Sequence, residues 1–423
     1  MKVTILPGAI KGETYAIASK SHLHRLLICA ALADAPTLVR CRTNAEDITA
    51  TIGCLSALGA KIERREDGFA VTPIDRNRLP AQCVLPCGES GSTLRFMLPI
   101  VGALGVSGRF EMSGRLPERP LAPLDEELCR NGIRLWRPDA TSLCCEGKLA
   151  PGDYSVRGDV SSQYITGLLL ALPLLGEPGS LSVIPPIESE DYIAMTLEVM
   201  AEFGLRPPVR DNRYEITGQG LISPGEATAQ GDWSNAAFWL CAGATPGGDI
   251  RISGLDRHSS QGDREVCAIL EQMGANVSWG EDGSLSVSEG GRRGVEIDAR
   301  ATPDLIPVLC VVAAVGEGVT TIKNAGRLRL KESDRIAATA QTLNALGAKI
   351  TEREDGLIVE GIPKLSGGEV DSWGDHRIAM MAGIASGACD GPVVITGAQA
   401  VNKSYPGFWQ KLAALGKEVT IGE

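Results

Sequence analysis

The chain of 423 residues is poor in histidine, with only four, and none of its twelve cysteines belongs to a C-x-x-C pair. Zinc sites usually combine such pairs with closely spaced histidines, so we expect no metal. Cysteine inside a protein behaves as a small apolar side chain. The twelve cysteines are therefore expected to be reduced thiols, most of them buried.

Long apolar runs are also missing. The longest lie near residues 165–175 and 305–315, and both contain a proline. Both are shorter than the ~20 residues that a membrane-spanning helix needs. The N-terminus, MKVTILPGAIKGE, has no apolar core of the length that a signal peptide requires. We therefore expect a cytoplasmic protein that does not act on membranes.

Positive charge is in deficit, since 41 Lys and Arg residues face 52 Asp and Glu residues, for a net charge of -11. A protein this acidic is not expected to bind nucleic acid or an anionic membrane. Its apolar content of 43% is ordinary for a globular protein. The length allows two or three domains of ~150 residues each. An anionic small molecule could bind only where cations gather locally.

A repeat of about 70 residues runs along the chain. In six segments an apolar-periodic helix ends at a glycine, and successive glycines are 73, 72, 70, 73 and 69 residues apart. Each glycine suits the left-handed position that ends a helix. A strand of alternating character follows. The six glycines are Gly59, Gly132, Gly204, Gly274, Gly347 and Gly416.

In several copies the strand leads into a hairpin. Asp67-Gly68, Asp282-Gly283 and Asp355-Gly356 each lie between two strand-like runs, and this dipeptide favours a tight turn. The period is longer than in solenoids, so closed domains are favoured over an open scaffold. We expect two pseudo-threefold α/β domains of three repeats each, with a boundary near 230–232. The strand at 2–6 precedes the first repeat, and the last repeat is short, so this strand is expected to complete the C-terminal domain.

Seven polar clusters interrupt the repeat, and most lie just before an apolar helix. A helix N-terminus favours anions, and neighbouring cations add full charges. Each cluster alone is equally consistent with a solvated helix end, but together they predict an anion-binding cleft between the two domains. The clusters are residues 18–25 (ASKSHLHR), 87–95 (CGESGSTLR), 114–120 (GRLPERP), 160–164 (VSSQY), 327–335 (RLRLKESDR), 373–379 (WGDHRIA) and 401–406 (VNKSYP).

Taken in this order, with SEDYI at 189–193 and ATPD at 301–304, the motifs resemble the family of 5-enolpyruvylshikimate-3-phosphate synthase, an enolpyruvyl transferase. The likeness covers nearly the whole chain. It implies two domains of three βαβαββ units each, an inverse α/β barrel. Residues 20–229 would form the N-terminal domain, mainly on the 3-phosphoshikimate side. Residues 1–19 plus 230–423 would form the C-terminal domain, with the active site in the interdomain cleft.

The resemblance implies transfer of the enolpyruvyl group of phosphoenolpyruvate to the 5-hydroxyl of 3-phosphoshikimate, with release of phosphate. This reaction lies on the shikimate pathway to chorismate and the aromatic amino acids. No metal and no organic cofactor is implied. The partners are the two small-molecule substrates, and a monomer is expected.

The resemblance also assigns residues. The catalytic candidates are Lys20, Asp304, Glu332 and His376. For 3-phosphoshikimate the ligands are Lys20, Ser21, Arg25, Ser161, Ser162, Gln163, Ser189, Asp304 and Lys331. For phosphoenolpyruvate they are Lys20, Gly91, Arg119, Gln163, Arg335, Arg377 and Lys403. The charges agree, because two phosphates and two carboxylates need several cations, and the planar guanidinium suits them.

The implied reaction is addition followed by elimination through a tetrahedral ketal. Asp304 is the implied base near the 5-hydroxyl. Glu332 is the first candidate for the acid and base at the methylene carbon, and Lys20 is the second. His376 either assists or is structural. Lys331 and Arg335 are four apart and would share a helix face if the helix extends that far.

Some positions depart from the family pattern. His24, Glu89 and Arg327 stand where asparagine is frequent, and Phe96 and Pro117 also differ from well-known members. Glu89 adds an anion near the phosphoenolpyruvate loop, and Arg327 adds a cation near the shikimate site. Gly91 is kept, so glyphosate, an analogue that competes with phosphoenolpyruvate, is expected to fit.

Two alternatives remain open. The sister enzyme that acts on UDP-N-acetylglucosamine has a Lys-Asn pair near its start and a reactive loop cysteine. Here Ser21 follows Lys20, and residues 114–120 contain no cysteine. A non-catalytic phosphosugar-binding repeat protein would tolerate loss of Asp304 or Glu332, yet both are present.

Overall fold

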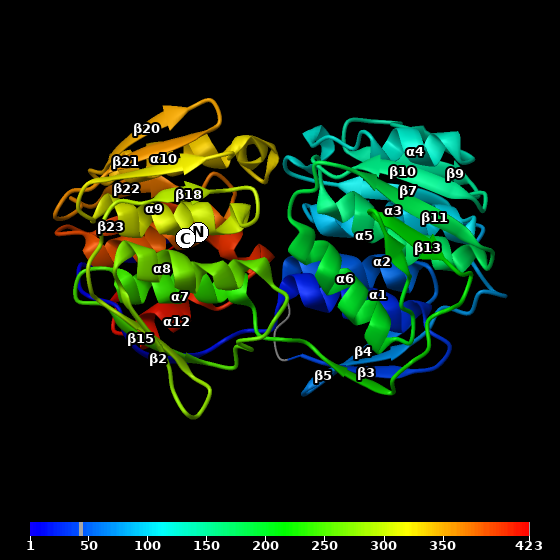
Figure 1. Ribbon diagram of the computed structural model, residues 1–423, viewed down its shortest axis with the longest axis horizontal. Helices are drawn as coiled ribbons and strands as arrows, with labels where there is room; N and C mark the ends of the chain where they lie inside the picture. Colours follow the sequence, from blue (N-terminus) through cyan, green and yellow to red (C-terminus); the bar gives the residue numbers. More distant parts are fainter. Residues whose placement is uncertain (42–44, 423) are drawn as a thin grey trace. The chain divides into compact units, whose positions relative to one another are not determined.

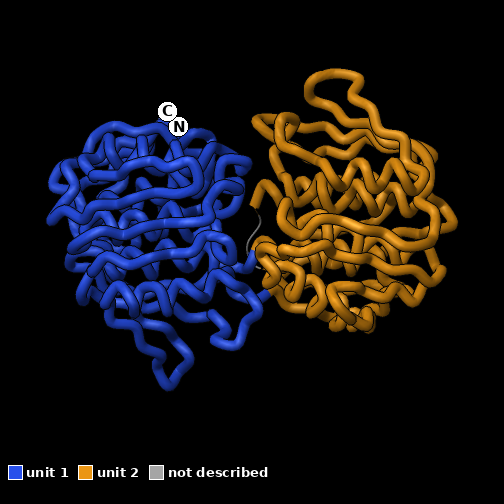
Figure 2. The backbone as a smooth tube through the Cα atoms, turned by 45° about the horizontal axis from the view of Figure 1, so that its top comes forward, with its two compact units in different colours: residues 1–19, 230–423 blue, residues 20–229 orange. Residues whose placement is uncertain are grey.

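The computed structural model describes residues 1–41 and 45–422. The chain forms two compact units, shown in Figure 2: unit 1 comprises residues 1–19 and 230–423, and unit 2 comprises residues 20–229. In each unit three four-stranded sheets lie on the outside and helices lie inside (Figure 1). Within the described residues, no helix is both long enough and apolar enough to cross a membrane.

The elements of unit 2 follow the predicted repeat. Its strands are β3 (Thr37–Arg40), β4 (Lys61–Arg65), β5 (Gly68–Thr72), β6 (Gln82–Gly88), β7 (Ser107–Met112), β8 (Ile133–Trp136), β9 (Ser142–Gly147), β10 (Asp153–Arg157), β11 (Gly179–Ile184), β12 (Val209–Arg210), β13 (Arg213–Ile216) and β14 (Glu226–Thr228). Its helices are α1 (Lys20–Leu32), α2 (Glu46–Ala57), α3 (Gly91–Leu104), α4 (Leu124–Arg130), α5 (Ser162–Ala171) and α6 (Glu190–Glu202), with 3-10 turns η1 (Leu116–Glu118) and η2 (Leu172–Leu175).

Unit 1 repeats the pattern. Its strands are β1 (Lys2–Ile5), β2 (Lys11–Tyr15), β15 (Asp249–Ser253), β16 (Asn276–Trp279), β17 (Leu285–Ser288), β18 (Glu296–Asp298), β19 (Val319–Lys323), β20 (Lys349–Arg353), β21 (Gly356–Glu360), β22 (Gly368–Asp371), β23 (Val393–Thr396) and β24 (Val419–Gly422). Its helices are α7 (Trp233–Ala244), α8 (Val266–Met273), α9 (Ile306–Ala314), α10 (Arg335–Ala345), α11 (His376–Ala385) and α12 (Phe408–Ala414), with 3-10 turns η3 (Gly262–Glu265), η4 (Pro303–Leu305), η5 (Gly326–Leu330), η6 (Ser386–Ala388) and η7 (Ala398–Lys403).

All six sheets share one strand order, as in β6-β7-β9-β8 and β18-β19-β21-β20. The first two strands of each sheet are parallel, and the last two form an antiparallel pair. In four of the six sheets a helix joins the first two strands, as α3 joins β6 to β7 and α9 joins β18 to β19. Each repeat is therefore a βαβαββ unit, and three of them build each half. This topology confirms the predicted fold class.

The sheets at the ends of each unit are completed by strands from elsewhere in the sequence. β1 pairs antiparallel with both β23 and β24, so the N-terminal strand is part of a sheet formed with the C-terminal end of the chain, as predicted. β14 pairs parallel with β3, and β2 pairs parallel with β15. Each of these two pairings joins a strand near residue 19 or residue 230, where the chain passes from one unit to the other, to a distant strand of its own unit.

The local turn predictions are confirmed. All six repeat glycines have positive φ, from 77° at Gly204 to 105° at Gly59 and Gly132. The three Asp-Gly sequences join the antiparallel pairs β4–β5, β16–β17 and β20–β21. None of the twelve cysteines forms a disulfide in the described chain, and eight are buried, as predicted.

Three helices form the centre of unit 1. In α7, α9 and α11 every residue is buried, and the three helices contact one another. Because they are surrounded by protein, they are apolar on all sides. Polar residues lie at their N-terminal ends, at 232–235, 301–304 and 373–377, and only the last of these ranges belongs to one of the seven predicted clusters.

Candidate active site

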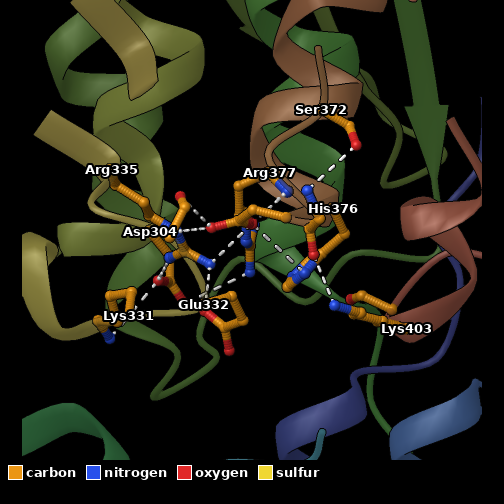
Figure 3. A network of polar contacts seen from close by, with 12 residues as sticks. Asp304, Lys331, Glu332, Arg335, Ser372, His376, Arg377 and Lys403 are labelled. Carbon is orange, nitrogen blue, oxygen red and sulfur yellow. Dashed lines mark hydrogen bonds and ion pairs between the residues drawn. The ribbon is translucent and has the colours of Figure 1, made fainter. Parts of the chain in front are cut away.

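One guanidinium holds three carboxylates in unit 1 (Figure 3). Arg335 is 2% exposed, and its Nη1 donates to Asp304 Oδ1 at 2.6 Å. Its Nη2 donates to Glu332 Oε2 at 2.7 Å, and its Nε donates to Asp375 Oδ2 at 2.8 Å. Two of the predicted catalytic carboxylates, Asp304 and Glu332, therefore share one buried cation.

Helix caps place these side chains. Asp375 caps α11 and accepts the backbone N–H of Arg377 at 2.8 Å, as aspartate at an N-cap commonly does. Asp334 caps α10, which begins at Arg335. Lys331 lies before that cap in extended backbone, so Lys331 and Arg335 do not share a helix face as the spacing had suggested. Lys331 Nζ nevertheless lies 3.7 Å from Asp304 Oδ1.

Arg377 joins three helix ends. Its Nη1 donates to the carbonyl of Ser234 at 3.0 Å, and its Nη2 hydrogen bonds to Ser234 Oγ in α7. The same Nη2 lies 3.4 Å from Asp304 Oδ2. The N-termini of α7 and α11 and the turn before α9 thus converge within unit 1.

The cations determine the state of Asp304. Burial would raise the pKa of this carboxyl, but Lys331, Arg377 and Arg335 together hold the pKa well below its usual range. The pKa of Asp375 is likewise lowered, because Arg335 outweighs burial. Burial lowers the pKa of Lys331 to about 8, and the nearby charges of Arg335 and Arg327 act in the same direction. Asp304 is therefore an ionised carboxylate that can accept a proton.

His376 and Lys403 lie beside the start of α11 (Figure 3). His376 is 2% exposed, and its Nδ1 lies 3.6 Å from Asp375 Oδ1. Lys403 is 8% exposed, and its Nζ donates to the carbonyl of Gly374 at 2.5 Å. Like Arg377, both side chains lie near Asp375, the residue that caps α11.

In unit 2, Lys20 is the first residue of α1, and its Nζ lies 2.7 Å from Asp47 Oδ2 in the first turn of α2. The two side chains are only 15% and 12% exposed. Removal of either partner would therefore leave a partly buried charge without its counter-ion.

Arg25 is held in place by its neighbours. It is 2% exposed, and its Nε donates to Thr196 Oγ1 at 2.8 Å. Nη1 donates to the carbonyl of Ser21 at 2.6 Å, and Nη2 donates to Thr166 Oγ1 at 3.2 Å and to the carbonyl of Tyr192 at 3.0 Å. Burial lowers the pKa of Arg25 to about 10. The side chain is a fixed cation at the junction of α1, α5 and α6.

Gly91 is the first residue of α3, and the guanidinium groups of Arg95 and Arg119 lie close to it. A Cβ on Gly91 would lie 2.5 Å from Arg95 Nη1 and 2.7 Å from Arg119 Nη1. Arg95 Nη1 also donates to Gln163 Oε1 at 3.2 Å, and Gln163 Nε2 donates to Ser92 Oγ at 2.8 Å. The structure therefore brings Gly91, Arg119 and Gln163 together, and it adds Arg95.

The predicted serines occupy helix starts. Ser161 caps α5 and accepts the backbone N–H of Gln163 at 3.3 Å, and Ser162 is buried in the first turn. Ser189 lies at the N-cap of α6 with a φ of 56°. Because α5 and α6 pack against each other, these serines lie at the starts of neighbouring helices in unit 2.

The two histidines of ASKSHLHR do not add charge. Burial, followed by the charge of Arg25, lowers the pKa of His22 to about 4, and burial also lowers the pKa of His24. His24 Nδ1 lies 2.7 Å from Thr51 Oγ1, and its ring packs edge-on against Phe96 with centroids 6.2 Å apart. Two departures from the family pattern, His24 and Phe96, are thus neighbours in the core.

Acid is expected to destabilise the protein through these histidines. Because the folded pKa of His22 is about 4 and the unfolded value is 6.5, its stabilising contribution is complete above 6.5 and is lost as pH falls toward 4. Each such histidine adds a slope of about 1.4 kcal/mol per pH unit to the free energy of unfolding. We expect the free energy of unfolding, measured with urea at several pH values between 4 and 6.5, to depend less steeply on pH in His22→Leu than in the wild type. His258→Leu, at an exposed position, is the control, and equal slopes in His22→Leu and the wild type would contradict the assignment.

Comparison with known proteins decides the family. The model of the family EPSP synthase (3-phosphoshikimate 1-carboxyvinyltransferase) matches residues 6–412. The chain belongs to the EPSP synthase family. It is 41% identical to the 3-phosphoshikimate 1-carboxyvinyltransferase of Clostridium beijerinckii over 99% of both chains. It is 40% identical to that of Clostridium kluyveri, over 99% of this chain and 98% of the relative.

Solved structures of EPSP synthase support the same assignment. The EPSP synthase from Acinetobacter baumannii superposes with a TM-score of 0.82 at 25% identity over 100% of both chains. The enolpyruvyl transferase NikO from Streptomyces tendae gives a TM-score of 0.76 at 20% identity, over 99% of this chain and 98% of that chain, and supports the fold alone.

Several residues of these networks were not among the sequence-based candidates, including Asp47, Arg95, Ser234 and Asp375. Arg95 and Asp375 lie inside predicted clusters, and the cap position of Asp375 could have identified it. Asp47 and Ser234 contact Lys20 and Arg377 across 27 and 143 residues of sequence, and no local pattern reveals such pairs.

Proposed function

We propose that Asp304, surrounded by Arg335, Arg377 and Lys331, is the reactive carboxylate of an EPSP synthase. The reaction is the transfer of the enolpyruvyl group of phosphoenolpyruvate to the 5-hydroxyl of 3-phosphoshikimate, with release of phosphate. The single observation that carries the role of Asp304 is its contact with Arg335 Nη1 at 2.6 Å in a site rich in cations. The sister reaction and a non-catalytic role are not favoured, since the full-length relatives are named 3-phosphoshikimate 1-carboxyvinyltransferase.

The cations of unit 1 divide into two kinds. Arg335 contacts three carboxylates, whereas Arg377 donates to Ser234 and lies 3.4 Å from the single carboxylate of Asp304, and Lys403 donates to the carbonyl of Gly374. We infer that Arg377 and Lys403 contribute positive charge for the binding of phosphoenolpyruvate. Arg335 mainly keeps the three carboxylates ionised and in place. To bind phosphoenolpyruvate, its guanidinium would have to give up a hydrogen bond to one of these carboxylates.

The base role of Asp304 depends on its neighbours. As long as no anionic substrate is bound, the nearby cations keep the pKa of Asp304 low, and this carboxylate is a weak base. An anionic substrate that pairs with those cations would raise the pKa of Asp304 and strengthen the base when both substrates are bound. Asp304 would then accept the 5-hydroxyl proton as the oxygen bonds to the second carbon of phosphoenolpyruvate. Glu332 or Lys20 would protonate the methylene carbon.

In the elimination step the bond between that second carbon and the phosphate oxygen breaks, and the new methyl group returns a proton to Glu332 or Lys20. The double bond is thereby restored and phosphate leaves. The proposed ligands of each substrate come from both units, so we propose that the two units act on one pair of substrates. All of them belong to one chain, and we propose an active monomer.

Lys20→Met is expected to lower kcat by about 10²–10⁴-fold, the usual effect of losing an acid–base group, with the fold retained. The variant also leaves Asp47 without its partner at 2.7 Å, so a moderate loss of stability accompanies it. Circular dichroism checks the fold, and Lys61→Met, at an exposed position of β4, is the matched control. A Lys20→Met variant with wild-type kcat would remove Lys20 from the mechanism.

Phosphate release tests the acceptor. Purified protein is incubated with phosphoenolpyruvate and either 3-phosphoshikimate or UDP-N-acetylglucosamine. We expect release only with 3-phosphoshikimate. Release only with the UDP-sugar would favour the sister reaction, and binding of 3-phosphoshikimate without release would favour the non-catalytic alternative.

A further inference from the structure

Two threonines that none of the seven polar clusters contains share the guanidinium of Arg25. Thr166 lies in α5 and Thr196 lies in α6, and both side chains are fully buried. Thr196 Oγ1 accepts from Arg25 Nε at 2.8 Å, and Thr166 Oγ1 accepts from Arg25 Nη2 at 3.2 Å. The two hydroxyl oxygens lie 2.8 Å apart. The two hydroxyls and the guanidinium therefore form one buried group of hydrogen bonds.

The protons of this group have one consistent arrangement. A hydroxyl has a single proton, and that of Thr196 goes to the carbonyl of Tyr192 at 2.9 Å. The hydrogen bond between the two threonines must then use the proton of Thr166. Arg25 Nη2 completes the ring, since it donates both to Thr166 and, at 3.0 Å, to the carbonyl of Tyr192. Every donor in the ring has an acceptor, so the geometry holds the guanidinium in one orientation.

This arrangement leaves one N–H of Arg25 for a ligand. A guanidinium has five N–H groups. Besides the two threonines, the acceptors are the carbonyls of Ser21 and Tyr192, and all four are neutral oxygens. The fifth N–H, on Nη1, has no acceptor among the described residues. No carboxylate hydrogen bonds to Arg25 in the part of the chain that the structure describes, so this buried cation favours an anionic ligand.

We propose that Thr166 and Thr196 are positioning residues that orient the guanidinium of Arg25 and so determine the affinity for 3-phosphoshikimate. This inference rests on the proposed function, because it takes Arg25 as a ligand of that substrate. Neither threonine touches the substrate in this scheme. Their hydroxyls hold Nε and Nη2, which leaves the remaining N–H of Nη1 for an oxygen of the substrate. Without these acceptors the guanidinium would turn toward other oxygens, and binding would weaken.

The first test separates the hydroxyls from their packing. Valine removes the hydroxyl and keeps the branched shape, whereas serine keeps the hydroxyl. Thr166→Val and Thr196→Val should each raise the KM for 3-phosphoshikimate about tenfold, the effect of one lost hydrogen bond, with the KM for phosphoenolpyruvate within about twofold. Thr166→Ser and Thr196→Ser should keep both KM values within about twofold of the wild type.

Thr37→Val is the matched control. Thr37 is a buried residue of β3 in the same unit, and its Oγ1 lies 2.7 Å from Ser223 Oγ. The control therefore also removes a buried threonine hydroxyl from a hydroxyl pair, but one that pairs with a serine instead of a guanidinium. It should leave both KM values within about twofold of the wild type.

A second test asks whether the threonines act through Arg25. In Arg25→Met the guanidinium is gone, so the addition of Thr196→Val should change the dissociation constant for 3-phosphoshikimate by less than about twofold. Calorimetry measures this constant without turnover. A further loss of about tenfold in the double variant would mean that the hydroxyl acts by another route, and it would overturn the inference.

The outcomes separate this inference from the proposed function. Equal increases of both KM values in the valine variants, or serine variants as poor as the valine variants, would show a packing role and overturn the inference. Valine variants that unfold by circular dichroism while Thr37→Val stays folded would do the same. If Arg25→Met does not fold or binds too weakly to measure, the comparison of valine with serine decides alone. A wild type that does not consume 3-phosphoshikimate would overturn the proposed function instead.

Discussion

Asp304→Asn is expected to lower kcat by about three orders of magnitude, within the range of about 10²–10⁴ for a lost general base. The amide keeps the shape of the side chain but cannot accept the 5-hydroxyl proton. Arg335 still pairs with Glu332 and Asp375, so the fold should persist. Steady-state kinetics, with calorimetry for the binding of 3-phosphoshikimate, separates loss of chemistry from loss of binding.

Asp298→Asn is the matched control for this experiment. Asp298 lies in β18 of the same unit, its side chain is 45% exposed, and it pairs with Arg300 at the surface. An exposed ion pair contributes about 0–1 kcal/mol, so the control should retain its activity and stability. If Asp304→Asn kept the wild-type kcat, Asp304 could not be the base.

Arg335→Leu is expected to give the largest loss of stability. Removal of this cation leaves three carboxylates, at Asp304, Glu332 and Asp375, facing one another with little solvent. Breaking a buried ion pair by removing one partner costs about 3–5 kcal/mol. Urea unfolding at neutral pH measures this loss. Arg300→Leu, whose side chain is 60% exposed, should change the free energy of unfolding by less than about 1 kcal/mol.

The pH dependence gives this prediction a second test. Without Arg335 the pKa of the fully buried Asp375 should rise above that of the unfolded chain, because burial is then no longer outweighed. A group of this kind contributes stability below its unfolded pKa and loses it as pH rises through the folded pKa. The deficit of Arg335→Leu should therefore shrink from pH 7 toward pH 5. A deficit that is small at pH 7, or that grows in acid, would mean that Arg335 does not hold these carboxylates.

The sequence predicted the repeat because its signals are local. A glycine at a left-handed position and an Asp-Gly turn fix their own backbone, and all six glycines and three hairpins were found where expected. The completion of the last sheet by β1 followed from a repeat that lacked one strand. The helix starts followed from the polar residues that precede apolar runs.

The pairing of charges could not be predicted, because it depends on distant segments. Nothing near Arg335 in the sequence indicates that it contacts Asp375, 40 residues later, rather than a ligand. Lys331 and Arg335 would share a helix face only if the helix extended to Lys331, and it does not, because the cap at Asp334 starts the helix at Arg335. The burial of both histidines of ASKSHLHR, which lowers their pKa values, likewise depends on distant segments and could not be predicted.

The central claim is that the chain transfers an enolpyruvyl group to 3-phosphoshikimate by addition and elimination. Phosphorus and proton magnetic resonance of the reaction in heavy water tests it most directly. We predict that phosphate appears one for one with consumed 3-phosphoshikimate, and that solvent deuterium enters the vinyl methylene of the product, since that carbon gains and loses a proton. Phosphate that appears without loss of 3-phosphoshikimate, or a product without deuterium, would contradict the account.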